Sequence, residues 1–387
     1  MRITMVNKYY WPPHLGGVET VVRNLSEGLV EHAGASVHAI VANEGRARVE
    51  DEVAGVHITR LPRQFALSSA PIALSMPGEL TREARSSTPP DVLNLHSPYP
   101  WGELSWLRAR PDVPTVLGYH SDIVRQKRML AAYKPFLERV LDSVDLITTS
   151  SPNLRDNSEF LSKRAEKVRI VDYGLHVEDI GDPPARVFRK AARIRDEHAG
   201  RSIVLFVGRL VYYKGADILV RAMAGVDADL VMIGRGPLEG ELREIATANG
   251  VADRISFLAP MEDADLWAYY RAADVLCLPS VASSEAFGLV QIEAHAAGTP
   301  VVSTNLPTSV PYANQHEVTG LTVPVGDVSA LAAALNRLLA DDEFRGRLGQ
   351  QARERAVARF SIPCFVNSML AVYDEASTIH KARRGKA

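Results

Sequence analysis

Short runs of β-branched and apolar residues alternate with segments whose apolar residues recur at helical spacing along the whole chain. Strands that alternate with helices in this way indicate α/β layers built on parallel sheets. The first series of expected strands comprises residues 3–7, 36–42, 56–60, 92–96, 115–119 and 146–150. The second series comprises residues 203–207, 230–233, 255–257, 275–278, 301–303 and 321–323. Two such series predict two Rossmann-like domains.

Glycine and proline interrupt both patterns between residues 171 and 184, which places a linker there. Near the end of the chain, helical patterns cover residues 330–339 and 343–359, and one more helical stretch runs to about Ser377. The expected domains are therefore residues 1–178 and 179–362, followed by a final helical segment over 363–387. The basic tail from His380 to Lys386 is expected to fray.

The composition is that of an ordinary soluble globular chain, with 387 residues of which 23% are charged and 46% hydrophobic. A formal net charge of -2 gives no reason to expect nucleic-acid binding. Cys277 and Cys364 are too few and too isolated for a disulfide framework or a metal site. The start of the chain has no secretory pattern, and no stretch of about 18 apolar residues occurs. We therefore expect a cytoplasmic protein in which any membrane contact is peripheral.

The segment Ser284–Val302 carries two carboxylates eight residues apart, Glu285 and Glu293, with Gly288 between them. Glycine lets the backbone approach a ligand, and the helix expected after it offers free N–H groups and a positive dipole end to phosphate oxygens. At about 1.5 Å per residue, Glu293 lies roughly 7–8 Å along the helix from Gly288, about the offset between a diphosphate and its ribose. The alternative is that two glutamates fall at this spacing by chance. The glycine turn, the apolar helix and the valine strand around them favour a nucleotide-diphosphate site.

This order of residues resembles the Glu-x7-Glu signature of retaining glycosyltransferases with the GT-B fold, a family that includes bacterial mannosyltransferases and glycogen and sucrose synthases. The resemblance implies an α/β protein whose two Rossmann-like domains face each other across a deep cleft, with a last helix that returns to the first domain. It also implies that Glu285 holds the transferred sugar and that Glu293 holds the ribose. The residues that it places around the donor in this segment are Glu285, Ala286, Phe287, Gly288, Leu289, Val290 and Glu293.

A second motif, Gly208-Arg209-Leu210-Val211-Tyr212-Tyr213-Lys214-Gly215, follows an expected strand. Open α/β sheets bind ligands at the carboxyl ends of their strands. Arg209 can make a two-pronged contact with phosphate oxygens, and Lys214 adds a compact positive charge. The alternative is a solvated loop with ordinary surface cations. The motif resembles the Gly-Arg-Leu-x-x-x-Lys-Gly signature of the same family, which implies that Arg209 and Lys214 neutralise the donor diphosphate.

Two features of the first half suit the same kind of site. Gly16 and Gly17 follow the first expected strand, where a glycine pair is either a plain turn or a place where the backbone approaches an anion. The absence of a full Gly-x-Gly-x-x-Gly argues against a dinucleotide oxidoreductase. His120 closes another expected strand, although a lone histidine is more often a packed or surface residue. The resemblance implies that Gly16 and Gly17 face the diphosphate and the acceptor, and that His120 binds the sugar and stabilises the transition state. For the nearby Asp122 we expect only a role in orienting the loop.

The segment 257–263 resembles the loop of the family that contacts the nucleotide base, with Ala259 where the usual residue is glycine. The resemblance implies that Met261 pairs with the base through its backbone and that Asp263 accepts a hydrogen bond from a guanine edge.

Basic residues punctuate an apolar helical stretch at 125–139. A basic amphipathic helix can lie on anionic lipid, and the alternative is a solvated helix face. The basic residues are Arg125, Lys127, Arg128, Lys134 and Arg139.

The predicted reaction is transfer of a sugar from a nucleoside diphosphate, GDP-mannose rather than a UDP-sugar, to an acceptor hydroxyl with retention of configuration. The acceptor is expected to be a glycan or a polyprenyl- or other lipid-linked molecule of surface polysaccharide or glycolipid synthesis. We expect no metal and no cofactor, since the nucleotide sugar is a substrate. The alternatives are a nucleotide-sugar epimerase of the same fold and a non-catalytic nucleotide-sugar-binding protein. The residues expected to carry catalysis are His120, Arg209, Lys214 and Glu285.

Overall fold

The computed structural model describes residues 1–12, 16–67, 70–122 and 127–385, and within these ranges it leaves the side chains of 127–132 undescribed. The chain divides into two compact units, each treated separately below. Unit 1 comprises Met1–Gly174 together with Ile362–Ala387, and unit 2 comprises Leu175–Ser361. The boundaries therefore fall at 174/175 and 361/362, where the sequence pattern placed them at 178/179 and 362/363.

The sheet of unit 1 is parallel except for one edge strand, β3 (Val49–Val53), which runs antiparallel to its neighbour. A separate hairpin pairs β5 (Phe65–Leu67) with β6 (Ala70–Ile72). In spatial order the main sheet contains β10 (Val168–Ile170), β9 (Leu146–Thr149), β8 (Thr115–Tyr119), β7 (Val92–Ser97), β1 (Arg2–Val6), β2 (Ser36–Ala42), β4 (Val56–Leu61) and β3.

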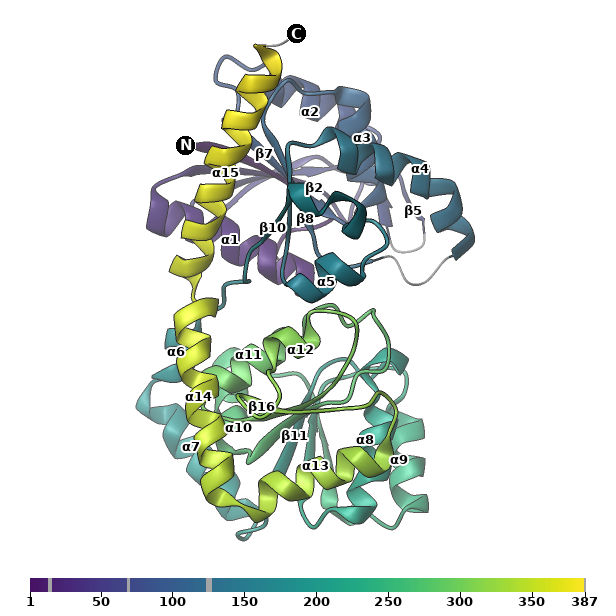
Figure 1. Ribbon diagram of the computed structural model, residues 1–387, viewed down its shortest axis with the longest axis vertical. Coiled ribbons are helices and arrows are strands. Elements are labelled where there is room, and N and C mark those ends of the chain that lie inside the picture. Colours follow the sequence, from purple (N-terminus) through teal and green to yellow (C-terminus); the bar gives the residue numbers. More distant parts are fainter. Residues whose placement is uncertain (13–15, 68–69, 123–126, 386–387) are drawn as a thin grey trace. The chain divides into compact units, whose positions relative to one another are not determined.

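Helices cover both faces of this sheet (Figure 1). On one side lie α1 (Gly17–Ala33) and α15 (Ile362–Arg384), and on the other lie α2 (Met76–Ala84), α3 (Pro100–Ala109) and α4 (Lys127–Ser143). Because successive strand residues point to opposite faces, Leu93 and Leu95 of β7 join the core under α2–α4, whereas Asn94 contacts α15. The face under α1 and α15 therefore receives Asn94 and His96 of β7.

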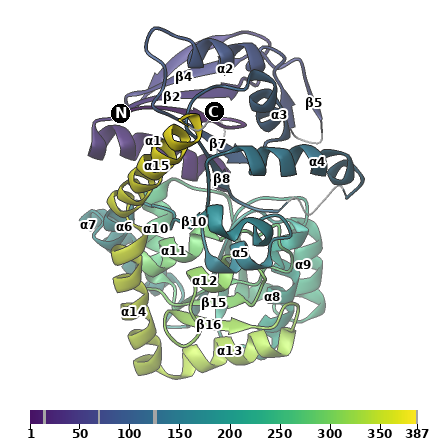
Figure 2. The ribbon, with the colours of Figure 1, turned by 45° about the horizontal axis from the view of Figure 1, so that its top comes forward.

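Unit 2 has an all-parallel sheet with helices on both faces (Figure 2). In spatial order it contains β13 (Ile255–Leu258), β12 (Asp229–Ile233), β11 (Ile203–Val207), β14 (Val275–Leu278), β15 (Val301–Thr304) and β16 (Gly320–Val323). One face packs on α7 (Ala185–Glu197), α10 (Asp263–Ala272) and α11 (Leu289–Ala296). The other face packs on α8 (Ala216–Ala222), α9 (Glu239–Ala248) and α13 (Val328–Ala340). Counted along the chain, this strand order is 3-2-1-4-5-6, the arrangement of nucleotide-binding Rossmann folds.

Shorter and peripheral helices complete the two units. In unit 1 these are α5 (Pro152–Asn157) and the 3₁₀ helix η1 (Ser162–Lys167). In unit 2 they are α6 (Val177–Gly181), α12 (Val310–Ala313), α14 (Asp342–Phe360) and the 3₁₀ helices η2 (Tyr212–Lys214), η3 (Met223–Gly225) and η4 (Ala252–Arg254). Among the residues that the structure describes, none of the helices combines the length and the apolar character needed to cross a bilayer.

The α/β class and the two Rossmann-like domains expected from the sequence are confirmed, and each expected strand is present to within about a residue at either end. The sequence pattern missed β3, β5, β6 and β10. The sequence of β3, Val-Glu-Asp-Glu-Val, has charges in its centre, and it becomes a strand because its backbone pairs with β4. The expectation that the tail frays from His380 is wrong, since α15 continues to Arg384. His380 lies within hydrogen-bond distance of Asp145 and Asp112, and these contacts hold the end of the helix.

One buried hydrogen bond ties α15 to the centre of the sheet of unit 1. The Tyr373 hydroxyl donates to Asn94 Oδ1 over 2.6 Å, and both side chains are fully buried. We expect Tyr373→Phe to lower the free energy of unfolding of unit 1 by about 1–3 kcal/mol, because the Asn94 oxygen is left buried without its donor. Urea-induced unfolding measures the change. Thr378→Ala on the exposed side of the same helix is the matched control, expected to stay within about 0.5 kcal/mol of the wild type. Equal stability of Tyr373→Phe and the control contradicts the prediction.

Candidate functional site

In unit 2 the chain order of the sheet reverses between β11 and β14. Strands on either side of that point lead to helices on opposite faces, so the loops after β11 and β14 diverge and leave room at the carboxyl ends of the strands. The predicted Arg209 and Lys214 lie in the first of these loops, and Glu285 to Val290 follow the second. The fold of unit 2 therefore brings the two sequence motifs to the same edge of its sheet.

The loop after β11 packs directly against the loop after β14. The amide of Val281 donates to the carbonyl of Tyr213 over 2.8 Å. Gly215 has a φ of +64°, and a Cβ there would lie 2.0 Å from the carbonyl oxygen of Pro279. Only glycine fits this conformation and this contact without strain. Arg209 lies at the exposed side of the loop, whereas Lys214 points inward.

Lys214 and Glu285 form an ion pair. Lys214 Nζ lies 2.6 Å from Glu285 Oε2, and the two side chains are only 12% and 9% exposed. The Ser280 hydroxyl donates to the same carboxylate oxygen over 3.1 Å. A buried charge is tolerated when a partner and hydrogen bonds compensate it. The residue predicted to hold phosphate and the residue predicted to hold the sugar thus touch each other.

The turn from β14 into α11 carries the residues predicted to bind the donor phosphates. Gly288 is the N-cap residue of α11 with a φ of +74°, a conformation that favours glycine. Leu289 and Val290 open the helix, so their amides have no carbonyl four residues earlier in the helix to bond. Phe287 is buried and packs edge-on against Phe360, which holds the turn in place. Ala286 accepts a backbone hydrogen bond from Ser309 over 2.8 Å.

Glu293 lies further along α11, where the Tyr270 hydroxyl of α10 donates to its Oε2. Burial raises the pKa of the Glu293 carboxyl, while the Tyr270 hydrogen bond lowers it and the charge of Asp263 raises it again. Asp263 is the exposed first residue of α10, and Met261 precedes it, half-buried against the α7 and α10 face. The structure therefore brings the predicted ribose residue near the predicted base loop.

Tyr270 was not identified from the sequence. It is fully buried, and its backbone carbonyl accepts from the Thr299 hydroxyl over 2.6 Å. In the sequence, Tyr270 occupies an apolar position of the helical pattern of α10. Residues at such positions usually belong to the core, so the pattern gave no indication of a contact with Glu293.

In unit 1 the predicted residues also follow strands of one sheet. Gly16 and Gly17 stand at the start of α1 and are exposed, and the neighbouring His14 lies outside the described residues. His120 follows β8 directly and is buried. Asp122 accepts hydrogen bonds from the hydroxyls of Tyr119, over 2.6 Å, and Ser158, over 2.7 Å, so it fastens the loop after β8.

The imidazole of His120 is engaged on both sides by protein groups. Its Nδ1 lies 2.7 Å from the Tyr173 hydroxyl, and its Nε2 lies 3.0 Å from Nδ1 of His96. Burial lowers the pKa of His120 to about 4. Burial, and secondarily the charge of His120, lower the pKa of His96 well below its ordinary value. His96 lies one residue before the end of β7, and His120 directly follows β8, so a histidine near the carboxyl end of a neighbouring strand was the available sequence signal for this contact.

The predicted lipid-facing helix corresponds to α4 and the residues before it. Arg125 lies outside the described residues, as do the side chains of Lys127 and Arg128. Lys134 pairs with Glu159, and Phe136 and Arg139 are exposed. Within the described part of the chain, no group of three or more His, Cys, Asp or Glu side chains is arranged to hold a metal ion.

The raised pKa of Glu293 predicts a pH-dependent gain in stability when the carboxyl is removed. A carboxyl whose pKa is raised in the folded state contributes stability that is present below its unfolded pKa, near 4.5, and is lost as the pH rises through the folded value. We therefore expect Glu293→Gln to be more stable than the wild type at pH 8, with a difference that shrinks toward pH 5. Urea-induced unfolding at several pH values measures this. The exposed Glu241→Gln is the control, expected to show a flat difference. A flat or inverted difference for Glu293→Gln contradicts the prediction.

Comparison with known proteins agrees with this geometry. The family described as Glycosyl transferases group 1 matches residues 188–355, and the family described as Glycosyltransferase Family 4 matches residues 15–179. The O-antigen chain mannosyltransferase C of Escherichia coli is 33% identical over 374 residues, which cover 96% of this chain and 98% of that protein. The D-rhamnosyltransferase WbpZ of Pseudomonas aeruginosa is 33% identical, over 92% of this chain and 91% of that protein.

Among solved structures, the sucrose-phosphate synthase of Thermosynechococcus elongatus matches with a TM-score of 0.78 and 25% identity, over 97% of this chain and 98% of that one. The likeness extends through both units, since little of either chain is left unmatched. Given this fold and an identity of 33% over nearly the full length of a mannosyltransferase, the chain belongs to the glycosyl transferases group 1, the GT-B glycosyltransferases.

Proposed function

We propose that the protein transfers a mannose-type sugar from a nucleoside diphosphate to a hydroxyl of a glycan or lipid-linked acceptor, with retention of the anomeric configuration. The observation that carries this proposal is the Lys214–Glu285 pair at the switch point of the sheet of unit 2, next to the opening turn of α11. It supplies a cation for phosphate and a carboxylate for sugar hydroxyls at one place.

The chemistry sets what these residues do. Breaking the bond between the sugar C1 and the phosphate oxygen builds negative charge on the leaving diphosphate and positive charge on the sugar ring. Arg209, Lys214 and the amides of Phe287–Val290 stabilise the leaving group, and preorganised charges of this kind often dominate catalysis. Glu293, oriented by Tyr270, holds the ribose hydroxyls. Met261 and Asp263 take the base.

Retention and metal independence are part of the proposal. A double displacement needs a carboxylate nucleophile on the far face of the sugar, and Glu285 is already occupied by Lys214 and Ser280. The acceptor oxygen then forms its bond to C1 on the face that the diphosphate leaves, and its proton passes to a diphosphate oxygen. The cations Arg209 and Lys214 serve in place of a divalent ion, and the nucleotide sugar is the sole small molecule required.

The donor and acceptor classes are supported by the names of the relatives, an O-antigen chain mannosyltransferase and a D-rhamnosyltransferase. We favour GDP-mannose over UDP-sugars, and a glycan acceptor carried on a lipid at the cytoplasmic membrane face. The exposed Phe136 and Arg139 of α4 support a peripheral contact with that lipid.

Incubation with radiolabelled GDP-mannose or UDP-sugars, membrane lipid extract and EDTA tests the proposal. We expect label from GDP-mannose to enter a lipid or glycan fraction at a rate that EDTA leaves unchanged, with an α-linked product. A donor that is only isomerised indicates an epimerase, and binding without turnover indicates a sensor; either result overturns the proposal.

Removal of the sugar-side charge should separate transfer from nucleotide binding. We expect Glu285→Gln to lower kcat by at least about 100-fold, because the carboxylate that orients the sugar is lost. GDP should still raise the Tm of this variant, because the phosphate and ribose contacts stay in place. Glu241→Gln, an exposed carboxyl of α9, is the matched control with wild-type kcat. A wild-type kcat for Glu285→Gln would contradict the assignment of Glu285 as the residue that orients the sugar.

A further inference from the structure

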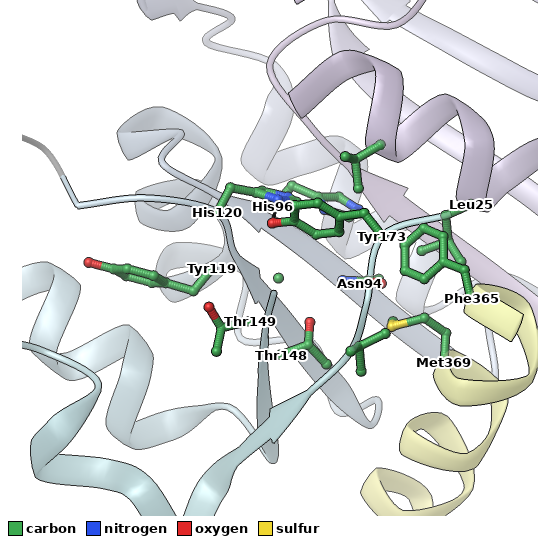
Figure 3. A pocket seen from close by; sticks show the side chains of 13 residues that line it. Leu25, Asn94, His96, Tyr119, His120, Thr148, Thr149, Tyr173, Phe365 and Met369 are labelled. Atoms are coloured by element: carbon green, nitrogen blue, oxygen red, sulfur yellow. Dashed lines mark hydrogen bonds between the residues drawn. The ribbon is translucent and has the colours of Figure 1, made fainter. Parts of the chain in front are cut away.

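Three aromatic side chains of unit 1 form a continuous hydrogen-bonded chain (Figure 3). Tyr173, His120 and His96 are 7%, 5% and 4% exposed. The two imidazole rings stack with their centroids 5.3 Å apart and their planes 18° from parallel. Figure 3 shows the three rings gathered on one side of a small cavity, with Thr148 and Thr149 on the other. Of these three residues, the family resemblance gives a role to His120 alone, and Tyr173 and His96 have no role assigned so far.

A glycine makes room for the contact between the two histidines. Gly118 lies inside strand β8, where glycine weakens a strand and usually marks a close approach. A Cβ at this position would lie 3.0 Å from Nδ1 of His96 and 3.5 Å from Nε2 of His120, the two atoms that face each other. A methyl group at residue 118 therefore presses against the hydrogen bond between the rings.

At the His96 end of this hydrogen-bonded chain, two polar side-chain atoms have no hydrogen-bond partner within the described residues. These are Nε2 of His96 and Oγ1 of Thr149, and both are buried. Both residues line the same cavity of about 10 Å³, close to the volume that holds one water molecule. Buried polar atoms in native proteins almost always have a protein or water partner. A single water molecule that bonds both atoms satisfies them.

The donors and acceptors along this hydrogen-bonded chain determine which nitrogen of each imidazole carries the proton. A neutral imidazole has one donor and one acceptor nitrogen, and the low pKa values of both histidines keep both rings neutral near pH 7. An imidazole nitrogen is a better acceptor than a phenol oxygen, so the Tyr173 hydroxyl donates to Nδ1 of His120. Nε2 of His120 then carries the proton and donates to Nδ1 of His96, which leaves the proton of His96 on its Nε2.

We propose that Tyr173 and His96 are positioning residues that hold His120 as a neutral ring protonated at Nε2, and that one buried water molecule between His96 and Thr149 ends the chain. The proposal rests on the proposed function, and it takes His120 to contact the transferred sugar, as the family resemblance implies. Positive charge develops on that sugar in the transition state. A positively charged imidazolium beside it would oppose the reaction, whereas a ring with both nitrogens engaged stays uncharged and fixed.

The protonation pattern is measured without any substrate. In ¹⁵N-histidine-labelled protein at pH 7, we expect the His120 signals to show an unprotonated Nδ1 and a protonated Nε2, and the His96 signals to show the same pattern. Gly118→Ala, which removes no polar group, should shift the Nε2 signal of His120 as the rings separate. A protonated Nδ1 on His120, or signals that Gly118→Ala leaves in place, overturns the proposal.

The water molecule has its own pair of variants. Thr149→Val should shift the Nε2 signal of His96, whereas Thr149→Ser, which keeps the hydroxyl, should not. Thr148→Val is the matched control, because Thr148 lines the same cavity but lies outside the hydrogen-bonded chain. An Nε2 signal of His96 that responds equally to all three variants overturns the water bridge.

Kinetics tests the positioning role. We expect His96→Leu to lower kcat roughly ten-fold with the donor KM within about two-fold, because the ring of His120 is displaced while the donor contacts of unit 2 remain. His96→Asn, whose amide oxygen can replace Nδ1 as an acceptor, should recover most of that loss. Equal kcat values for the Leu and Asn variants overturn the positioning role.

The outcomes separate this inference from the proposed function. If the protein shows the expected histidine tautomers but transfers no sugar from any donor, the hydrogen-bonded chain is supported and the proposed function is refuted. Transfer from GDP-mannose, with kcat unaffected by His96→Leu, supports the function and refutes the inference.

Discussion

The common direction of the strands is the constraint on which the chemistry of this protein depends. Except for β3 and the small hairpin, the strands are parallel, so within each unit the loops that follow them collect at one edge of a sheet. In unit 2 the strand order reverses between β11 and β14, and that single feature brings Lys214 to Glu285 although a whole set of strands and helices separates them in sequence. In unit 1 the same rule brings His96 and His120 together from the ends of two neighbouring strands.

Each of these sites also buries a polar group that water would otherwise stabilise, so the protein must compensate the free-energy cost of desolvation. Glu285 is compensated by a full ion pair, Glu293 by one phenolic hydroxyl, and the two histidines by giving up their charge. These solutions differ in what they leave available to a ligand. A paired carboxylate keeps its charge, a carboxyl with one donor keeps free lone pairs, and a neutral imidazole with both nitrogens engaged keeps only its shape and its fixed place.

Much of this arrangement can be predicted from the sequence. The β-branched runs locate the buried parallel strands, because strands covered on both faces must be apolar. Glycine positions and the resemblance to a known signature point to Lys214, Glu285 and Glu293 as members of one site. The charged edge strand β3 could not be found, since backbone pairing with β4 forms it and no side-chain pattern reports that.

The hydrogen-bond partners of the predicted site residues could not be found from the sequence either. Tyr270, His96 and Tyr173 meet Glu293 and His120 through strand register and helix packing between distant segments. Periodicity within one segment carries no information about such contacts. The basic tail was misread for the same reason, because Asp112 and Asp145, which hold His380, lie more than half the chain away.

The division of the chain also sets an order of folding during synthesis. Unit 1 is made of two pieces, and all of unit 2 lies between them in the sequence. A ribosome adding 5–20 residues per second spends roughly 10–40 s on the intervening segment. Throughout that time the face of the unit 1 sheet that carries Asn94 lacks the helix that covers it. Unit 1 is therefore completed only after unit 2 has been synthesised, because its last helix, α15, follows unit 2 in the sequence.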